Sequence, residues 1–263
     1  MKQISSADNP TFRLLRQLAE SGRERRKRRR TLLDGAHLVQ TYLERIGAPE
    51  MLVASRSGLD RPEIRRLAER AAAGSTLVLT DELFEAVAPV DTPSGVLALV
   101  PIPPEPAAVP ARNSCVVLES VQDAGNVGSI LRSAAAAGVP LALLTRGCAQ
   151  AWSPKVLRAA MGAHFSLGIL EHADPAALLA AYPGAVVATR ADAPLRIFEA
   201  DLRGPVAWLF GSEGAGLSPE VAALARLAVA IPMPGGAESL NVAAAAAICL
   251  YEQLRQRQVV DRS

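Results

Sequence analysis

The sequence predicts an α/β protein built in two parts. Half of its 263 residues are apolar, which is enough to bury a sizeable core. Short apolar stretches alternate with segments of helical periodicity, an order typical of α/β folds. The segment PIPPEPAAVP, residues 101–110, has five prolines in ten residues and can continue neither a helix nor a central strand. We therefore expect a stiff linker at 105–111 between a first domain, 1–104, and a second, 112–263.

The first domain is predicted to be a small α/β unit. Its helical patterns cover residues 10–19, 35–45, 61–72 and 81–88. Its strand-like stretches cover residues 51–55, 76–80 and 95–100.

The second domain is predicted to contain a mostly parallel sheet. Its apolar stretches cover residues 115–118, 141–145, 167–170, 185–189, 206–210 and 227–231. Runs this continuous suit strands that are buried on both faces. Ligands of such sheets bind at the carboxyl ends of the strands, in the loops that lead to helices. Three of these loops have unusual compositions.

The loop after 115–118 reads ESVQDAGNVGSILRS and leads into a helix. Asn126 could simply cap that helix. Arg132 is harder to explain, because it lies in a helix of small apolar residues that should pack closely on the sheet. An arginine in such a place must be paired or must face a ligand.

The loop after 206–210 reads GSEGAGLSPE and is not a phosphate loop. It has neither the GxGxxG spacing nor a following GK[ST]. Glu213 would oppose an anion, so the glycines indicate close backbone approach to a neutral or cationic ligand.

The loop after 227–231 reads PMPGGAESLNVA. Ser239 or Asn241 could cap the alanine-rich helix that follows. Against that reading, three loops from separate strands all place polar side chains at one sheet edge, which is how α/β sites are assembled.

Two further segments are candidates for phosphate contacts. The run GRERRKRRR, residues 22–30, is either a solvated or flexible segment or a nucleic-acid contact, and the two readings have equal weight. Lys155 and Arg158, in a capped helix, could meet phosphates or form a solvated face. The candidate contacts in the basic run are Arg23, Arg25, Arg26, Lys27, Arg28, Arg29 and Arg30.

The remaining composition favours a cytoplasmic protein. No apolar run is long enough to span a bilayer, and the start of the chain lacks a signal-peptide pattern. The cysteines, at 115, 148 and 249, have no CxxC spacing, so they are interpreted as core thiols in a reducing compartment. We expect no membrane segment and no metal site.

Three motifs resemble a known family. NVGSILR (126–132), GSEGAGLS (211–218) and IPMPGGAESLNVA (231–243) are similar to the signatures of the SpoU, or TrmH, family of RNA 2′-O-ribose methyltransferases, in the SPOUT superfamily. Residues 1–104 resemble, more weakly, an L30e-like substrate-binding domain. The resemblance implies a methyltransferase domain with a trefoil knot at about 209–241, S-adenosyl-L-methionine as cofactor and a homodimer formed through the C-terminal domain.

The resemblance also implies roles for individual residues. The backbone around Leu209, Gly211, Ile231 and Leu240 would bind the cofactor, with Thr189 beside it. Arg132 matches the position implicated in activating the ribose hydroxyl. Because arginine stays protonated, we interpret it as an electrostatic stabiliser of the alkoxide or as a base acting through a phosphate. The other catalytic candidates are Asn126, Glu213, Ser239 and Asn241.

The sequence thus predicts methylation of a ribose 2′-hydroxyl in RNA, with 23S ribosomal RNA the expected substrate. The alternatives are a transfer RNA substrate, or a non-catalytic RNA-binding protein that retains the fold. A nucleotide-dependent oxidoreductase is disfavoured because GxGxxG and its acidic partner are missing.

Overall fold

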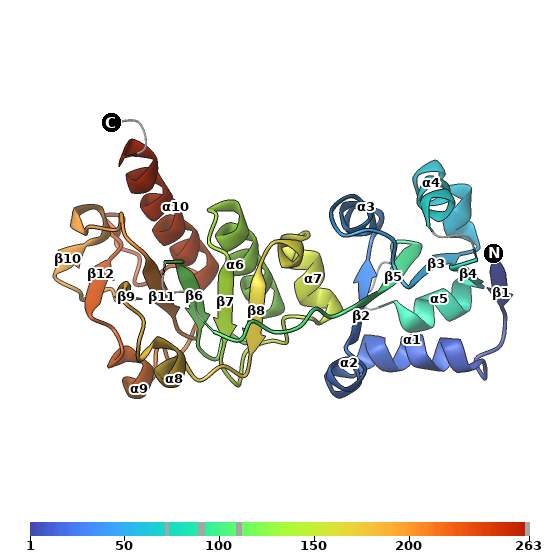
Figure 1. The fold of residues 1–263 in the computed structure, drawn as a ribbon, viewed down its shortest axis with the longest axis horizontal. Helices are drawn as coiled ribbons and strands as arrows, with labels where there is room; N and C mark the ends of the chain where they lie inside the picture. The colour runs from blue at the N-terminus through green and yellow to red at the C-terminus, as the bar shows by residue number, and fades with distance from the viewer. Residues whose placement is uncertain (72–73, 89–92, 109–111, 261–263) are drawn as a thin grey trace. The chain divides into compact units, whose positions relative to one another are not determined.

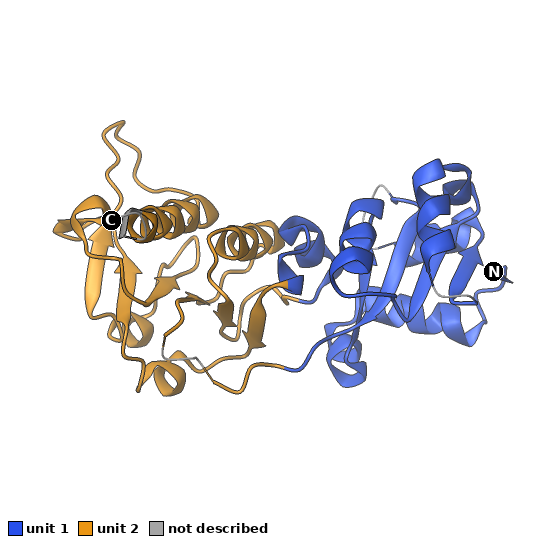
Figure 2. Ribbon diagram, turned by 45° about the horizontal axis from the view of Figure 1, so that its top comes forward, with its two compact units in different colours: residues 1–104, 152–165 blue, residues 105–151, 166–263 orange. Residues whose placement is uncertain are grey.

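A computed structural model describes most of the chain, namely residues 1–71, 74–88, 93–108 and 112–260. Residues 109–111 of the predicted linker, residue 72 of a predicted helix and the last three residues of the predicted second domain lie outside this set. The chain forms two compact units, coloured separately in Figure 2. The N-terminal unit comprises residues 1–104 and 152–165, and the C-terminal unit comprises 105–151 and 166–263.

Within the described residues, the N-terminal unit contains a five-stranded mixed sheet in the order β1-β4-β3-β5-β2. β1, β4 and β3 run parallel, whereas β5 is antiparallel to both β3 and β2. The strands are β1 (Lys2–Ile4), β2 (Arg30–Asp34), β3 (Met51–Ser55), β4 (Thr76–Leu79) and β5 (Val96–Pro101).

Helices cover the sheet of the N-terminal unit. α1 begins where Asn9 caps it, accepting the Thr11 amide at 2.9 Å, and Pro10 takes the first helical position. α1 packs on α5, where Phe12, Leu15 and Phe84 enter one apolar core. The helices are α1 (Pro10–Glu20), α2 (Gly22–Arg28), α3 (Ala36–Arg45), the 3-10 helix η1 (Ser57–Asp60), α4 (Pro62–Arg70) and α5 (Asp81–Val87).

Residues 152–165 pack with the N-terminal unit, although the sequence assigned them to the second domain. They form α7 (Pro154–Ala160) and the 3-10 helix η2 (Ala163–Phe165). The hydroxyl of Thr31 donates to the Trp152 carbonyl at 2.7 Å in the interior. The ring of Tyr42 meets Phe165 edge-on, with centroids 5.4 Å apart. A boundary drawn at the proline-rich segment alone therefore leaves the N-terminal unit incomplete.

Within the described residues, the C-terminal unit contains a seven-stranded, wholly parallel sheet in the order β10-β12-β9-β11-β6-β7-β8. β11 lies between β9 and β6, and its five residues are all buried. The strands are β6 (Cys115–Leu118), β7 (Leu141–Leu144), β8 (Gly168–Glu171), β9 (Ala185–Thr189), β10 (Leu195–Arg196), β11 (Val206–Phe210) and β12 (Leu227–Ala230).

Helices lie on both faces of this sheet, with α6 and α10 on one face and α8 and α9 on the other (Figure 1). Side chains along β11 alternate between the two faces, so that Leu209 enters the core beside α8 and α9. The helices are α6 (Ala124–Ala136), α8 (Pro175–Leu179), the 3-10 helix η3 (Ile197–Glu199), α9 (Pro219–Ala222) and α10 (Val242–Val260).

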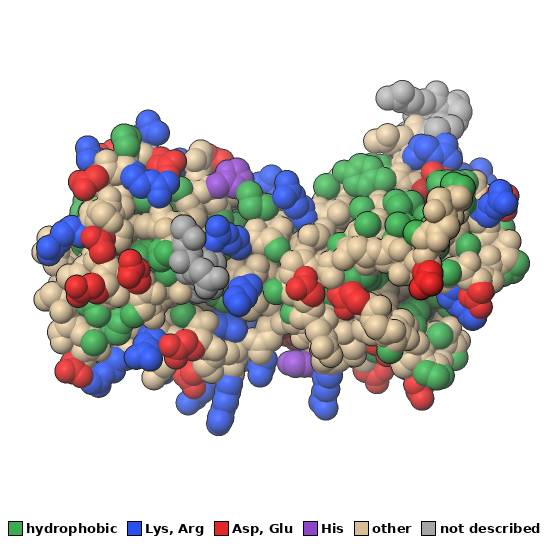
Figure 3. Space-filling model, turned by 180° about the vertical axis from the view of Figure 1, so that it is seen from behind, with side chains coloured by type: hydrophobic (Ala, Val, Ile, Leu, Met, Phe, Trp, Pro, Cys, Tyr) green, Lys and Arg blue, Asp and Glu red, His purple; other side chains and the backbone are tan. Residues whose placement is uncertain are grey.

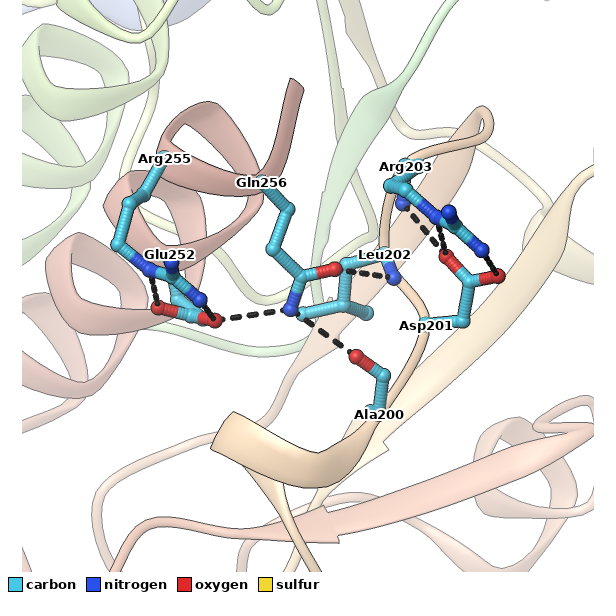
Figure 4. A network of polar contacts seen from close by, with 7 residues as sticks. All are labelled: Ala200, Asp201, Leu202, Arg203, Glu252, Arg255 and Gln256. Atoms are coloured by element: carbon cyan, nitrogen blue, oxygen red, sulfur yellow. Dashed lines mark hydrogen bonds and ion pairs between the residues drawn. The ribbon is translucent and has the colours of Figure 1, made fainter. Parts of the chain in front are cut away.

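Polar side chains fix α10 in place. Gln253 accepts the Trp208 indole N–H at 3.0 Å and donates to the Ser114 hydroxyl at 3.0 Å, both in the interior. Gln256 accepts the Leu202 amide and donates to the Ala200 carbonyl, as Figure 4 shows. Because α10 begins directly after Asn241, these contacts also fix the end of the last glycine-rich loop.

The observed elements agree with most of the predicted ones. β1, β2, β10 and α2 were not predicted as separate elements, because they are short or highly charged. The predicted α/β class and parallel second sheet are confirmed. The trefoil knot at 209–241 stays a prediction. No helix in the described residues is long and apolar enough to cross a membrane.

Candidate active site

Loops from adjacent strands meet at one edge of the C-terminal sheet. β6, β11, β9 and β12 are consecutive neighbours and run parallel, so their carboxyl ends lie side by side. The three loops singled out in the sequence follow β6, β11 and β12. Their predicted convergence is therefore a direct consequence of the strand order.

A cavity of about 380 Å³ lies at this edge. One wall is the loop after β11, and the other is the end of the loop after β12 with the start of α10. Thr189, at the end of β9, also lines it. The lining residues are Thr189, Phe210, Gly211, Ser212, Glu213, Gly216, Leu217, Ser239, Leu240, Asn241, Val242 and Ala245.

Two asparagines and a glutamate from the three loops form a hydrogen-bonded chain. Nδ2 of Asn241 donates to Oδ1 of Asn126 at 2.9 Å. Nδ2 of Asn126 donates to Oε1 of Glu213 at 2.6 Å. The chain therefore joins the starts of α6 and α10 to the loop after β11. Its members are three of the five catalytic candidates.

The direction of these hydrogen bonds is fixed at both ends. Oδ1 of Asn241 accepts the backbone amides of Ala243 and Ala244, at 2.9 and 3.3 Å, so its Nδ2 must be the donor to Asn126. At the other end, the carboxylate of Glu213 can only accept when ionised. Asn241 thus caps α10, as one reading of the sequence suggested, and also belongs to the site.

A smaller cavity of about 120 Å³ shares Thr189, Ser239, Leu240 and Ala245 with the larger one. Ile231 and Met233 give it apolar walls. Arg190 also lines it. Its Nε and Nη2 donate to the two carboxylate oxygens of Asp192, at 3.0 and 2.8 Å.

The cofactor candidates fall into two groups. Thr189, Gly211 and Leu240 line the larger cavity, and Ile231 lines the smaller one. Leu209, in contrast, is fully buried in the apolar core and lines neither. Its side chain is therefore structural, whereas its neighbour Phe210 lines the cavity, and the expected cofactor contact of the Leu209 backbone stays a prediction.

Sequence reasoning missed several lining residues, among them Phe210, Ser212, Met233 and Ala245. Phe210 carried a usable signal, since it is the last residue of a strand that leads into a glycine-rich loop. The apolar or small side chains of Met233 and Ala245 gave no such signal.

Arg132 lies on the exposed side of α6, whereas Val127, Ile130 and Leu131 are buried. It has no hydrogen bond or ion pair within the described part of the chain, and it lines neither cavity. Of the two expected alternatives, a pair within the chain is not found among the described residues, and an Arg132 that faces a ligand stays a prediction. Its catalytic role stays a prediction.

The lining of the larger cavity suits a neutral or cationic ligand. Glu213 is the one charged side chain among the described residues that line it. A methyl group on Gly211 would overlap the backbone of Gly216 and Leu217, so the loop is closed tightly upon itself. S-adenosylmethionine is a sulfonium cation without a phosphate, and this lining fits it better than it fits an anion.

Comparisons with known proteins decide the family. The model of the SpoU rRNA methylase family matches residues 113–251, more than half of the chain. The chain belongs to the SpoU rRNA methylase family. A second model, the MRM3-like substrate binding domain, matches residues 9–98. The predicted family is confirmed, and the SpoU match includes the segment 152–165 that packs with the N-terminal unit.

Similar proteins match this SpoU chain over nearly its full length. It is 32% identical to the 23S rRNA (guanosine(2553)-2′-O)-methyltransferase RlmP of Bacillus subtilis, over 95% of this chain and 98% of that protein. It is 34% identical to an uncharacterized tRNA/rRNA methyltransferase of Synechocystis, over 97% and 94%. The solved structure of the SpoU methyltransferase AviRb from Streptomyces viridochromogenes with AdoMet superposes with a TM-score of 0.83, at 27% identity over 95% and 98%.

The basic run of this SpoU chain forms α2 and the start of β2. Arg23, Arg26 and Lys27 are exposed, three and four residues apart on one helical face. No hydrogen bond or ion pair engages their side chains within the described residues. Lys and Arg side chains project along the lower edge of the N-terminal unit in Figure 3, in the region of α2.

Arg25 is a correction to the predicted RNA contacts. Only 5% of it is exposed, and its Nη1 donates to the carbonyls of Leu18 and Ala19, at 2.6 and 3.1 Å. These carbonyls end α1, where a cation is favourable. Arg25 therefore stabilises the helix end and is not available to RNA.

The other cations of the run have protein partners. Arg28 pairs with Glu24 at 3.0 Å, and Arg30 pairs with Glu50 at 2.7 Å. Arg29, in the left-handed conformation at the end of α2, donates to the carbonyls of Ile102 and Pro103. These contacts reduce, without abolishing, the charge that they offer to a phosphate.

Lys155 and Arg158 lie on α7, within the N-terminal unit. Lys155 is exposed. Arg158 pairs with the buried carboxylate of Asp34 at 3.2 Å, and Ser94 donates to the same carboxylate at 2.6 Å. Burial raises the pKa of Asp34, while the hydrogen bond from Ser94 and the charge of Arg158 oppose that rise. Arg158 thus has a structural partner besides any role toward RNA.

The described residues contain no group of three or more His, Cys, Asp or Glu placed to hold a metal ion.

Proposed function

We propose that this chain transfers a methyl group from S-adenosylmethionine to a ribose 2′-hydroxyl of ribosomal RNA. The observation that carries the proposal is the chain of hydrogen bonds from Asn241 through Asn126 to Glu213, at the rim of a cavity whose lining suits a cation. Three family motifs supply one member each. This convergence supports an active site rather than three independent loop structures.

The two cavities, which share four lining residues, are proposed to hold the cofactor. When bound, S-adenosylmethionine supplies an electrophilic methyl group and a positive sulfonium charge. Ile231, Met233 and Leu240 offer apolar surface, which suits a planar heterocycle. The backbone of Gly211 and the carboxylate of Glu213 line the larger cavity, where a cationic group is favoured. Ser239 and Thr189 lie along both cavities and would supply hydroxyl contacts.

The chain must also prepare the ribose hydroxyl, which is a weak nucleophile. In-line displacement depends strongly on the positions of nucleophile and methyl, so orientation supplies much of the acceleration. Each asparagine amide group has a second N–H that the hydrogen-bonded chain from Asn241 to Glu213 does not use. We assign these donors of Asn126 and Asn241 to positioning the ribose. Arg132 would stabilise the developing alkoxide or act through a phosphate.

Ribosomal RNA is the proposed substrate class. The family description, the MRM3-like substrate binding domain and the full-length similarity to RlmP support it. The similar Synechocystis protein is described as acting on transfer or ribosomal RNA, so transfer RNA remains an outcome of the test. The unpaired cations Arg23, Arg26 and Lys27 are proposed to contact the RNA backbone, where clustered charge adds affinity without sequence specificity.

We further propose a homodimer formed through the C-terminal domain. Tyr251 on α10 is 50% exposed, and Arg132 on the neighbouring helix α6 has no partner among the described residues. A second copy of the chain that covers these helices would bury Tyr251 and could give Arg132 a partner. Sedimentation equilibrium tests this, and a monomer at micromolar concentration would contradict it.

The proposed compartment is the cytoplasm. Burial raises the pKa of the Cys115 thiol to about 12, and burial also raises the pKa values of Cys148 and Cys249. Cysteines 115, 148 and 249 are all free thiols, which is consistent with a reducing environment.

The test is a methyl-transfer assay with the purified full chain. Tritiated S-adenosylmethionine is supplied with 23S rRNA fragments or with a transfer RNA pool, and ribose methylation is read as resistance to alkaline cleavage. We expect incorporation into ribosomal RNA. Arg132→Ala should lower the rate by about 100-fold or more, the loss expected for a transition-state stabiliser, with cofactor affinity nearly unchanged.

Arg226→Ala is the matched control, because Arg226 is also exposed in the C-terminal unit and lines neither cavity. Incorporation only into transfer RNA would replace the substrate. Cofactor binding without methylation of any cellular RNA would support the non-catalytic alternative. Full activity of Arg132→Ala would remove that residue from the mechanism.

A further inference from the structure

Glu119, directly after β6, accepts two hydrogen bonds from the last residue of the loop that follows β11. Its Oε2 accepts the backbone N–H of Ser218 at 2.8 Å, and its Oε1 accepts the Ser218 hydroxyl at 2.7 Å. Both donors belong to one residue, so the carboxylate holds that residue in position and orientation. Hydrogen bonds to an ionised acceptor are roughly twice as strong as those between neutral groups.

Ser218 ends the loop that forms one wall of the larger cavity. The loop leaves β11 at Gly211 and closes where the amides and carbonyls of Ser212 and Gly216 bond reciprocally at 3.0 Å. The backbone of Gly216 and Leu217 then packs against Gly211 with no space for a side chain. A loop packed this tightly moves as one piece. Fixing Ser218 therefore fixes the whole wall.

Glu119 is itself firmly held. Its backbone N–H donates to the Phe210 carbonyl at 2.8 Å, which extends the pairing of β6 with β11 by one residue. The chain turns away at once, because Ser120 adopts the left-handed conformation with φ 53°. The Ser120 amide is bonded to the Thr145 hydroxyl at 3.2 Å. The carboxylate is thus offered from a rigid strand end.

The segment after β6 is hydrogen-bonded to the loop at two points. Glu119 bonds to Ser218, and Asn126 bonds to Glu213. The second contact belongs to the hydrogen-bonded chain of catalytic candidates. The first lies outside it, since Glu119 lines neither cavity. Losing the first contact would let the wall shift and would draw Glu213 away from Asn126.

We infer that Glu119 is a positioning residue that holds the cofactor-binding wall in its binding conformation. It acts on S-adenosylmethionine only through Ser218 and the loop 211–218. A purely local role is the competing explanation, because Ser218 also caps α9 by accepting the Val221 amide at 3.2 Å. The inference rests on the proposed function, because it presumes that this cavity binds the cofactor.

The test compares cofactor binding and kinetics in the full-length protein. Glu119→Ala removes both hydrogen bonds, so the Kd for S-adenosylmethionine, measured by calorimetry, should rise about tenfold or more. KM for the cofactor should rise in parallel, while kcat at saturating cofactor changes less. Glu119→Gln should be largely rescued, because its amide can accept the Ser218 N–H and donate to the Ser218 hydroxyl.

Asp174→Ala is the matched control. Asp174 also accepts two hydrogen bonds, in its case from the backbone amides of Ala176 and Ala177, and it caps α8 without lining either cavity. It should lower thermal stability by an amount similar to that of Glu119→Ala but leave the cofactor Kd unchanged. If Glu119→Ala behaves in the same way, Glu119 is only a structural residue and the inference is overturned.

Ser218→Ala covers the case in which Glu119→Ala fails to fold. It keeps the backbone hydrogen bond to Glu119 and loses the hydroxyl one together with the cap of α9, so we expect a rise in Kd of about threefold. An unchanged Kd in Ser218→Ala would then reject the role of Glu119. Wild-type protein that binds no cofactor would instead overturn the proposed function, which separates the two failures.

Discussion

Nδ2 of Asn241 lies 2.9 Å from Oδ1 of Asn126, across residues 115 positions apart in the chain. The α10 amides fix the orientation of Asn241, and Asn241 in turn fixes that of Asn126. Asn126 is then left with its Nδ2 directed at Glu213. The start of α10 and the loop after β11 are thereby coupled through one amide side chain.

This coupling predicts that Asn126→Asp is more damaging than Asn126→Ala. Alanine loses two hydrogen bonds, for which we expect a 10- to 100-fold fall in methylation rate, from about 1.4–3 kcal/mol. Aspartate can still accept from Asn241, but it replaces the donor to Glu213 with a second carboxylate, and like charges at this distance repel. Rates under single-turnover conditions measure the difference. An aspartate variant as active as the alanine variant would contradict the assignment of Asn126 as the hydrogen-bond donor to Glu213.

The tight loop after β11 predicts opposite outcomes at two neighbouring glycines. A methyl group at Gly211 would overlap the backbone of Gly216, whereas at Gly214 it would meet no atom within 4 Å. Gly211→Ala should therefore lower cofactor affinity by about tenfold or more, because strain of a few kcal/mol must displace the wall. Gly214→Ala should bind normally. Calorimetric titration of both variants decides, and equal affinities would contradict the described loop.

The helix α2 predicts a division among its cations. Replacing Arg23, Arg26 and Lys27 together by alanine should weaken RNA binding and lower the slope of log K against log salt by about two to three. Thermal stability should change little, since the three side chains are exposed and unpaired within the described residues. Filter binding at several salt concentrations measures the slope, and an unchanged slope would exclude this face from the RNA contact.

Arg25→Ala should lower the stability of the fold and leave RNA binding unchanged. Because it removes a buried cation from the end of α1, we expect a loss of about 1–3 kcal/mol in the free energy of unfolding. The salt dependence of RNA binding should remain that of the wild type. Urea unfolding measures the loss, and an RNA-specific defect without destabilisation would restore Arg25 to the RNA contacts.

Arg158 and Lys155 are also predicted to behave differently. Arg158→Ala leaves the buried Asp34 with the Ser94 hydrogen bond but without its cation, so the N-terminal unit should lose about 1–3 kcal/mol of stability. Lys155→Ala, on the exposed part of the same helix, should leave stability unchanged. Hydrogen exchange at β2 reports on the unit itself, and equal protection in the two variants would contradict a structural role for Arg158.

Glu252 predicts a pH dependence of stability. The hydrogen bond and charge of Arg255, together with Gln256, lower the pKa of this carboxyl from its ordinary value of 4.5, although burial opposes the shift. The folded pKa therefore lies below the unfolded one. Ionised Glu252 stabilises the fold above about pH 4.5, and this contribution is lost as pH falls through the folded pKa.

The comparison is between the wild type and Glu252→Gln, by urea unfolding from pH 3 to pH 7. We expect the wild type to be more stable by a constant amount at the upper end of this range. The difference should shrink toward pH 3 as the carboxyl protonates. A difference that grew at low pH would contradict the direction of the shift.

Much of the fold was predictable because the strands are strongly apolar. Predicted strands 115–118, 185–189 and 206–210 coincide with β6, β9 and β11. β2 was missed because its sequence, RTLLD, begins and ends with a charged residue. The carboxylate of Asp34 is nevertheless buried, and only the tertiary contacts with Ser94 and Arg158 make that possible.

The site was predictable at the level of loops but less so for individual side chains. Parallel strands place their carboxyl ends at one edge, so Asn126, Glu213 and Asn241 could be expected to meet. Burial within a helix or strand depends on which face the neighbours cover, which a single sequence does not specify. Arg132 therefore proved exposed, Arg25 buried and Leu209 part of the core.

The placement of residues 152–165 bears on how such proteins could exchange parts during evolution. The segment is encoded between two strands of the C-terminal sheet, yet Trp152 and Phe165 pack with the N-terminal unit. Recombination at the proline-rich segment alone would separate Thr31 and Tyr42 from their packing partners. We expect a functional chimera to need residues 1–104 and 152–165 from the same parent, so a single crossover in the proline-rich segment would not exchange complete units.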